Sequence, residues 1–410
     1  MSHNAIFPSF FFAGFECSTF VWKDGERKDF IALTGHDKHL EQDCDRMSKL
    51  GIAVVRESVP WPFVDKGNGQ YDWSRVDQTA DSLACCDITP IWDLFHYGIP
   101  DGCDLFSDEC RERFVAYARA VAEHVIPRNP DATPFFTPVN EITFFSGAAT
   151  DMGWMYPFAK GRYAELKRVL CRMSIEAAKA IREVDPRARF VHVDPMIHAV
   201  APPDHPELAE QAYEHAYEQA YEAWDMLAGK AAPELGGSKD ILDIVGVNVY
   251  NFCQAQINPD GSRDVLGPDD PRRKPLSELL QFVWDRYHVP IVIGETSGFQ
   301  EFRADWLRAT MEECMKALVK GIDLQGVCLY PFVDIPDWNT QEWAKLGLYD
   351  IEDKETCERV PCEPYIAELR RWQKVLDQPE WLEQDGGRVN LDEVVHYAKE
   401  WMRMKKAGMR

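Results

Sequence analysis

Short runs of β-branched and aromatic residues alternate along this chain with long amphipathic helical patterns. The strongest helical patterns cover 110–126 and 163–184, and the second ends where Pro186 forbids a further turn. Strands that alternate with helices form parallel sheets, because each helix carries the chain back to start the next strand. The eight predicted strands are 10–15, 52–58, 88–95, 135–141, 189–195, 241–250, 289–297 and 324–332.

Eight strands with helical crossovers favour a closed (β/α)8 TIM barrel with inserted loops and helices over an open sheet. An open nucleotide-binding sheet would carry a glycine-rich phosphate turn after its first strand, and "GFECSTF" (14–20) has none. With 410 residues, 45% of them hydrophobic, the chain has enough apolar material for a large core. We predict a catalytic barrel over 1–375 and a C-terminal helical extension, 376–410, packed on it.

The charge balance limits the partners of the protein. A formal net charge of −23 repels nucleic acid and anionic lipid surfaces, and no run rich in Lys or Arg offsets it locally. We therefore expect no nucleic-acid or membrane partner, and a small neutral molecule instead. The opening segment 5–20 is apolar, but it lacks a basic start and a cleavage site, so it is predicted as a first strand and not a signal peptide.

The cysteines predict a reducing compartment. The twelve cysteines are scattered through apolar or helical settings, without the short regular spacings of a disulfide framework. The pairs Cys103/Cys110 and Cys357/Cys362 resemble half of a zinc site, but neither has a matching Cys or His pair to complete it. We expect reduced thiols, a cytoplasmic location, no metal and no organic cofactor.

Two glutamates follow predicted strands at equivalent places. Glu141 ends the fourth predicted strand and Glu295 comes late in the seventh. Catalytic groups of a barrel of this kind sit where its strands end. Two carboxylates that face one space can cleave a glycosidic bond, one as proton donor and the other as nucleophile or base. For either glutamate alone a structural ion pair would be the better interpretation, but the two together favour function.

A helical repeat of tyrosines is the one internal repeat of the chain. Tyr213, Tyr217 and Tyr221 recur every four residues in "AYEHAYEQAYEA" (212–223) and so lie along one side of a helix. Such a stripe packs against neighbouring elements or forms a lid that presents aromatic rings to a ligand, and the pattern favours packing.

Several segments resemble glycoside hydrolases, in the order in which one family carries them. "TPVNE" (137–141) resembles the T-x-N-E motif of clan A glycoside hydrolases, and "IGETSG" (293–298) resembles their strand-seven segment. Glycoside hydrolase family 1 is the most similar family, through "VVRESVPW" (54–61), "PIWDLFHYGIPDG" (90–102), "DIVGVNVY" (243–250) and "VDIPDWNTQEWAKLGLYDI" (333–351). The resemblance spans about residues 10–352, which is nearly the whole predicted barrel.

This resemblance implies roles for individual residues. Glu141 would be the general acid/base and Glu295 the nucleophile of a retaining β-glycosidase. Asn140 would bind the 2-hydroxyl of the sugar, and Arg56 and Tyr250 would support the Glu295 carboxylate. Two further residues match positions that line the sugar subsite: His96 and Trp338. A core ion pair for Arg56 and simple packing for Tyr250 are the structural alternatives.

The chain departs from the family pattern where the family binds glucose. A glutamine that grips the glucose hydroxyls is replaced by Val21, and a glucose-binding glutamate is replaced by Asp337, one methylene shorter. Glu16 is a candidate polar substitute from the first strand, although an ion pair with an arginine would explain it as well. Ordinary β-glucosidase specificity is therefore not expected.

The sequence predicts a retaining β-glycosidase that acts on a small β-glycoside or oligosaccharide and has a non-standard sugar specificity. Two alternatives stand beside it. One is a transglycosidase that uses the same site, and the other is a noncatalytic carbohydrate-binding descendant of the family. The sequence leaves open the sugar, the linkage, the aglycone and the oligomeric state.

Overall fold

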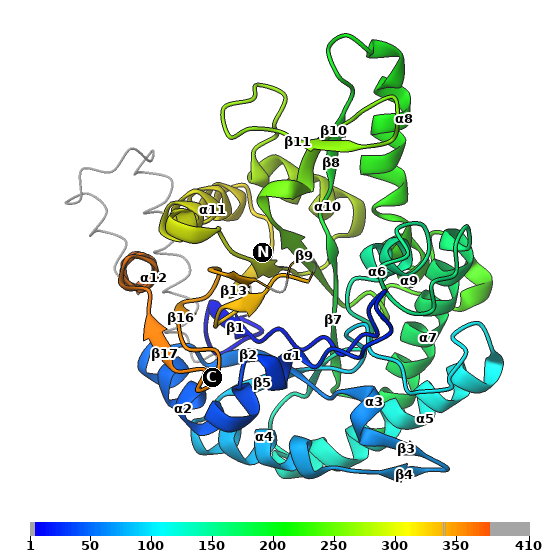
Figure 1. The fold of residues 1–410 in the computed structure, drawn as a ribbon, viewed down its shortest axis with the longest axis vertical. Coiled ribbons are helices and arrows are strands. Elements are labelled where there is room, and N and C mark those ends of the chain that lie inside the picture. Colours follow the sequence, from blue (N-terminus) through cyan, green and yellow to red (C-terminus); the bar gives the residue numbers. More distant parts are fainter. Residues whose placement is uncertain (1–4, 339, 341, 378–410) are drawn as a thin grey trace.

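A closed barrel of eight parallel strands forms the centre of the protein (Figure 1). The computed structural model describes residues 5–338, 340 and 342–377. Around the barrel the strand order is β1-β13-β12-β9-β7-β6-β5-β2, and β1 closes the ring by pairing with both β13 and β2. The strands are β1 Phe11–Gly14, β2 Val54–Ser58, β5 Thr89–Asp93, β6 Phe135–Thr137, β7 Arg189–Pro195, β9 Ile244–Val249, β12 Ile291–Thr296 and β13 Leu324–Leu329. The predicted (β/α)8 fold is confirmed, and each of the eight predicted runs contains one barrel strand.

Helices surround the barrel, because each apolar helix face packs on the outside of the strands. In α5 (Asp108–Val125), the side chain of the N-cap residue Ser107 accepts a hydrogen bond from the Cys110 N–H, and Asp108 and Glu109 complement the helix dipole. The predicted helix 163–184 is α7 (Tyr163–Val184). Other helices are α1 Phe30–Leu33, α2 His36–Lys49, α3 Trp61–Val64, α4 Ser74–Cys85, α6 Ile142–Ala149, α9 Glu222–Leu227, α10 Leu276–Tyr287, α11 Arg303–Val319 and α12 Glu363–Asp377.

A layer of apolar side chains fills the inside of the barrel, one from each strand. It consists of Phe12, Val54, Ile91, Phe135, Val191, Ile244, Val292 and Cys328. Because side chains alternate between the two faces of a strand, the residue two positions further on also points inward. Those residues include Arg56, Asp93 and Tyr330, so polar groups lie directly above the apolar layer, towards the carboxyl ends of the strands. Gly14 leaves room for Tyr330, since a Cβ atom there would lie 2.2 Å from its ring.

Insertions extend the structure beyond the barrel. A small sheet of β8 (His198–Val200), β10 (Gln254–Ile257) and β11 (Arg263–Val265) lies at the top of Figure 1 beside α8 (Ala209–Glu214). Short two-stranded pairs are β3 Asp65–Gly67 with β4 Gln70–Tyr71, β14 Ile335–Pro336 with β15 Trp343–Ala344, and β16 Tyr349–Ile351 with β17 Arg359–Pro361.

The tyrosine repeat begins with Tyr213 in α8 and continues with Tyr217 in a π-helix, His215–Gln219. The rings of Tyr217 and Tyr221 lie 5.0 and 5.1 Å from the ring of Phe282 in α10, and both tyrosines are buried. Tyr213 is 56% exposed and contacts the Tyr217 ring at 5.0 Å. Two of the three tyrosines therefore pack against a neighbouring helix, as the pattern favoured.

The C-terminal prediction concerns residues that are largely outside the described part of the chain. α12 ends at Asp377, and 378–410 are not described. The helical extension 376–410 and its boundary with the barrel at 375 stay predictions. The twelve cysteines all lie within the described residues, and all are unpaired.

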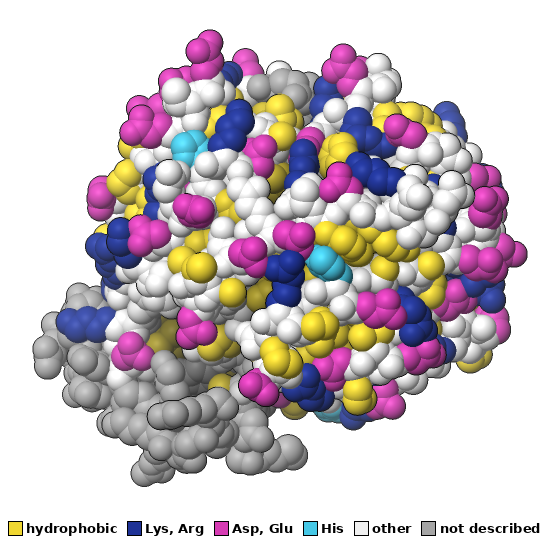
Figure 2. All heavy atoms as spheres, turned by 90° about the horizontal axis from the view of Figure 1, so that it is seen from below, with side chains coloured by type: hydrophobic (Ala, Val, Ile, Leu, Met, Phe, Trp, Pro, Cys, Tyr) yellow, Lys and Arg dark blue, Asp and Glu magenta, His cyan; other side chains and the backbone are white. Residues whose placement is uncertain are grey.

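One side of the molecular surface can be followed in Figure 2. The side of the molecule shown in Figure 2 carries acidic and basic side chains mixed together. None of the helices in the described residues is both long enough and apolar enough to span a lipid bilayer.

Candidate active site

The segment that follows β6 carries Asn140 and Glu141 across the mouth of the barrel. The Asn140 N–H donates to the Phe95 carbonyl at 2.9 Å, and the Glu141 N–H donates to the Val193 carbonyl at 3.0 Å. These two bonds hold the segment between the ends of β5 and β7. Glu141 then turns into the left-handed region, with φ 45°, before α6 begins. A residue other than glycine is strained in this left-handed region, and such backbone strain is typical of functional sites.

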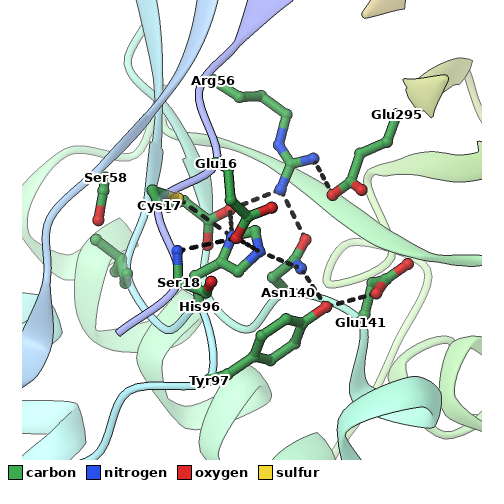
Figure 3. A network of polar contacts seen from close by, with 12 residues as sticks. Glu16, Cys17, Ser18, Arg56, Ser58, His96, Tyr97, Asn140, Glu141 and Glu295 are labelled. Atoms are coloured by element: carbon green, nitrogen blue, oxygen red, sulfur yellow. Dashed lines mark hydrogen bonds and ion pairs between the residues drawn. The ribbon is translucent and has the colours of Figure 1, made fainter. Parts of the chain in front are cut away.

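Glu295 is held by one cation and one hydroxyl, and Figure 3 shows the first of these contacts, with Arg56. Nη1 of Arg56 donates to Oε1 of Glu295 at 2.7 Å, and the Tyr250 hydroxyl donates to Oε2 at 3.1 Å. The register between β12 and β9 shifts between Ile293 and Glu295. This irregularity places Glu295 three positions beyond Val292 of the inner layer, where strict alternation would not direct it inward.

Glu141 has no cationic partner in the described residues and is held by two neutral donors instead. The Tyr97 hydroxyl donates to Oε2 at 2.5 Å, and Nδ2 of Asn248 donates to Oε1 at 2.7 Å. Burial and the negative charge of Glu295 raise the pKa of Glu141 to about 8, against the effect of the two donors. Burial also raises the pKa of Glu295 above its usual range, but there the Arg56 guanidinium acts in the opposite direction. Of the two carboxyl groups, only Glu295 has a cation beside it that favours its ionised form.

Arg56 connects the two sides of the site. Its Nη1 also donates to the Gly294 carbonyl at 3.2 Å, and its Nη2 donates to Asp93 Oδ2 at 2.6 Å and to Asn140 Oδ1 at 2.7 Å. The guanidinium is fully buried, so these charge-assisted bonds are strong and fix its position. Arg56 therefore forms a buried ion pair, which was the structural interpretation of this residue. It also contacts Glu295, which was the interpretation that the resemblance implied.

The Asn140 amide orients His96. Because Oδ1 of Asn140 accepts from Arg56, its Nδ2 faces the ring of His96 and donates to Nε2 at 3.1 Å. The Asp93 carboxylate lies 3.1 Å from Nδ1 of His96 and favours the doubly protonated, cationic ring. In that form, however, the Nε2–H group would point at the Asn140 Nδ2 group, which is itself a donor. The contacts therefore fit a neutral imidazole with its proton on Nδ1.

Cys17 joins Asp93 and His96 in a buried group whose possible ligand atoms lie within 4.8 Å of one another. Sγ of Cys17 lies 3.2 Å from Nδ1 of His96, and burial raises the pKa of the thiol to about 11, so it stays neutral. The Arg56 guanidinium donates to Oδ2 of Asp93, and its positive charge would repel a metal cation. The group serves the hydrogen-bond network better than it would serve a metal.

Glu16 reaches the same network from the loop after β1. Its Oε1 accepts from the Ser18 N–H at 3.1 Å and lies 3.8 Å from Nε2 of His96. Within the described residues no arginine or lysine forms an ion pair with Glu16, so the arginine pair considered from the sequence is not observed.

Trp338 and Asp337 lie next to each other but differ in their surroundings. The Trp338 ring lies 5.9 Å from the ring of Tyr97, which contacts Glu141. Asp337 is exposed, and its Oδ1 accepts from the Thr340 N–H at 2.8 Å. Val21 is half-buried and forms a β-bridge with Arg27. The structure thus brings together the predicted site residues other than the exposed Asp337, and the roles of all of them stay predictions.

Comparison with known proteins agrees with the resemblance seen in the motifs. No protein-family model matches the chain. The aryl-phospho-beta-D-glucosidase BglC of Bacillus subtilis is 24% identical over 411 aligned positions, which cover 82% of this chain and 85% of that protein. Beta-glucosidase A of Thermotoga maritima is 21% identical over 391 positions, which cover 80% and 84%.

Solved structures show the same fold. A β-glucosidase from Thermotoga maritima in complex with glucoimidazole matches with a TM-score of 0.75 at 17% identity, over 90% of this chain and 99% of that one. The structure described as a family 1 β-glucosidase from the same organism matches with a TM-score of 0.73 at 18% identity, over 90% and 98%. The chain is similar in sequence to β-glucosidases and shares their barrel fold.

Three residues of the site were not singled out from the sequence: Tyr97, Asn248 and Asp93. Each lies within a segment that resembles the family, Asp93 and Tyr97 in "WDLFHY" (92–97) and Asn248 in "VGVNVY" (245–250). A signal was therefore present, but only the three-dimensional structure shows that two of them are the hydrogen-bond donors of Glu141.

Proposed function

We propose that the protein is a retaining β-glycosidase that hydrolyses a small β-glycoside or oligosaccharide. The observation that carries this proposal is the difference between its two buried carboxyl groups. Glu141, with a pKa of about 8, has a proton to give at neutral pH, whereas Glu295 is paired with Arg56. A proton donor and an ionised nucleophile in one site are the requirements for double displacement.

In the first half-reaction the Glu295 carboxylate attacks the anomeric carbon while Glu141 protonates the departing oxygen. The bond to the aglycone breaks, and an ester between sugar and Glu295 forms. The Tyr250 hydroxyl, 3.1 Å from Oε2 of Glu295, holds the carboxylate in position for this attack. Tyr97 and Asn248 hold the Glu141 carboxyl group. In the second half-reaction Glu141 takes a proton from water, which then hydrolyses the ester.

Asn140 is proposed to bind the 2-hydroxyl of the sugar. In the free protein its Nδ2 donates to Nε2 of His96 at 3.1 Å and to the Tyr97 hydroxyl at 3.0 Å. A sugar hydroxyl that takes one of these places would be bound beside both carboxyl groups. A bond of this kind strengthens as the transition state develops positive charge on the ring.

The curated relatives support this substrate class by their names, β-glucosidase and aryl-phospho-β-D-glucosidase. The test is a panel of aryl β-glycosides that differ only in the sugar, with the configuration of the first product followed by NMR. We expect hydrolysis of at least one member with the β-anomer released first. An inverted product, or no turnover of any member, would overturn the proposal.

The same panel separates hydrolysis from transglycosylation, because both share the glycosyl ester. With a sugar or alcohol acceptor added, a transglycosidase converts most of the released glycosyl unit into a new glycoside. A hydrolase gives mainly free sugar. A noncatalytic descendant would bind the sugars without turning any of them over.

A further inference from the structure

Glu16 is a buried carboxylate with unused hydrogen-bonding capacity. Only 4% of the residue is exposed. Its Oε1 accepts the single hydrogen bond from Ser18, and its Oε2 accepts none within the described residues. Since an ionised carboxylate offers about four acceptor sites, most of its capacity is free for a ligand. Within the described residues its only ion-pair candidate is His96, whose Nε2 lies 3.8 Å from Oε1, so the place of this buried carboxylate in the site requires a reason.

The side chain of Glu16 faces the space that the catalytic candidates share. Burial raises the pKa values of the Tyr97, Tyr250 and Tyr330 hydroxyl groups, and in each case the negative charge of Glu16 adds to the effect. The charge of Glu16 also contributes to the raised pKa of Glu295. Figure 3 shows Glu16 beside His96, with Glu141 and Glu295 on the other side of the network.

Negative charge dominates this space. The carboxyl groups of Glu16, Asp93, Glu141 and Glu295 are all buried there with the single guanidinium of Arg56. The four N–H bonds of its Nη1 and Nη2 are directed at protein acceptors, and only the buried Nε–H has no partner within the described residues. No other arginine or lysine in the described residues forms an ion pair with these carboxylates.

We propose, building on the function above, that Glu16 determines sugar specificity by accepting hydrogen bonds from hydroxyl or ammonium groups and by repelling anionic sugars. The substrate is then a neutral or cationic glycoside and not a phosphorylated one. This separates the chain from its relative in Bacillus subtilis, whose name describes an aryl-phospho-β-D-glucosidase.

The experiment compares three aryl β-glucosides with a hydroxyl, an ammonium or a phosphate group at carbon 6. They are tested on the wild type, on Glu16→Gln and on Glu26→Gln. Glutamine keeps the shape of Glu16 but removes its charge, and Glu26 is a matched control because its side chain is 76% exposed in the same loop. The Coulomb interaction of the Glu16 charge with a charged substituent acts across the width of a sugar ring. The comparison therefore does not depend on which hydroxyl group Glu16 contacts.

For the wild type, kcat/KM should be at least about tenfold lower for the phosphate compound than for the hydroxyl compound. Among the three compounds, kcat/KM should be highest for the ammonium compound. Glu16→Gln should raise the ratio of phosphate to hydroxyl by about tenfold and lower the ratio of ammonium to hydroxyl. Glu26→Gln should leave both ratios within twofold of the wild type. A steric barrier to phosphate would persist in Glu16→Gln, so unchanged ratios in that variant would overturn the proposal. A wild-type preference for the phosphate compound would also overturn it.

A binding measurement keeps this inference separate from the proposed function. Affinities of glucose, 6-amino-6-deoxyglucose and glucose 6-phosphate are measured by calorimetry with the same three proteins. If no glycoside is hydrolysed, the proposed function fails, but the same order of affinities and the same response to Glu16→Gln would support the role of Glu16. If the three sugars bind equally, or none binds, the role of Glu16 is overturned.

Discussion

Glu141 and Glu295 have the same side chain, and their neighbours make them different. Arg56 lies against one and not against the other, while burial raises the pKa values of both. The guanidinium of Arg56 favours the ionised form of Glu295, and Glu141 has no cation of this kind beside it in the described residues. The consequences can be tested by changing one residue at a time.

Replacing Glu141 by alanine should affect substrates according to their leaving groups. A poor leaving group needs the proton from Glu141, so its kcat/KM should fall by about 10²–10⁴-fold. An acidic phenol departs without protonation, so its first step should change much less. Added azide should then speed the second step by attacking the glycosyl ester in place of activated water. Equal losses on both kinds of substrate, with no azide effect, would contradict the assignment.

The pH profile of kcat/KM should have an alkaline limb set by Glu141. Because its pKa is raised to about 8, the acid form is present below that pH and is lost as the pH rises through it. Activity should therefore fall above about pH 8. On the acid side, activity should fall as Glu295 is protonated. With an activated aryl substrate the alkaline limb should disappear in Glu141→Ala, and a limb that persists unchanged would show that another group is responsible.

Val21 stands where the resemblance places a glucose-binding glutamine. A hydrogen-bonding group missing from this position changes discrimination by about 1–3 kcal/mol, so plain β-glucosides should be poor substrates compared with sugars altered or extended at carbons 3, 4 or 6. Val21→Gln should shift the ranking of the aryl panel towards the glucoside. If the wild type already prefers the plain glucoside by tenfold, and the variant ranks the panel identically, the position does not control specificity.

At the scale of the elements, the strands could be predicted and their side-chain contacts could not. Each strand shows as an apolar run between helical patterns, which is why all eight were located from local sequence alone. The partners of Glu141 lie 44 and 107 residues away in the chain, at Tyr97 and Asn248. Strand register determines such contacts, and a pattern of apolar residues carries no information on register across a closed barrel.

The irregularity in β12 illustrates the same limit. A regular strand would direct Gly294, and not Glu295, to the inside of the barrel after Val292. Glu295 was selected from the sequence by its place near the end of a predicted strand and not by alternation, and the resemblance to the family then implied its role. The small sheet of β8, β10 and β11 was missed for another reason, since β10 (QAQI) and β11 (RDV) are rich in polar residues and do not form apolar runs.

A buried charge network links elements on the outside of the barrel, away from the reaction. Nδ1 of His36 in α2 lies 2.9 Å from Asp43, its Nε2 lies 3.2 Å from Glu57 in β2, and Arg359 of β17 pairs with Asp43 at 2.7 Å. Although burial acts to lower the pKa of His36, the charges and hydrogen bonds of Glu57 and Asp43 raise it to about 9.

The free energy of unfolding should therefore depend on pH through His36. Its folded pKa of about 9 lies above the unfolded value, so the contribution is complete below about pH 6.5 and is lost as the pH rises to about 9. Its size is ~3 kcal/mol from the shift. Urea unfolding at pH 6 and pH 9.5 should show a larger loss for the wild type than for His36→Gln. Equal losses in the two proteins would show that His36 is not charged in the folded state.

At the scale of the whole molecule, closure of the barrel brings distant segments to one place. Glu16 follows β1, Arg56 belongs to β2, Glu141 follows β6 and Glu295 belongs to β12, and all face the same mouth. The net charge of −23 surrounds this site with a negative field, which slows the approach of anionic ligands and favours neutral or cationic ones. The field and the local charge of Glu16 therefore act in the same direction.

The most direct test of the central claim is to trap the ester on Glu295. A 2-deoxy-2-fluoro-β-glycoside with a dinitrophenolate leaving group, built on the best sugar of the aryl panel, forms the ester readily but hydrolyses slowly, because fluorine destabilises the positively charged transition state. We predict rapid inactivation and a mass increase of one fluoroglycosyl unit, located by peptide sequencing on Glu295. Glu295→Gln should gain no mass and lose at least about 10⁴-fold in kcat while staying folded. An active enzyme that is not labelled, or that is labelled on another residue, would contradict the account.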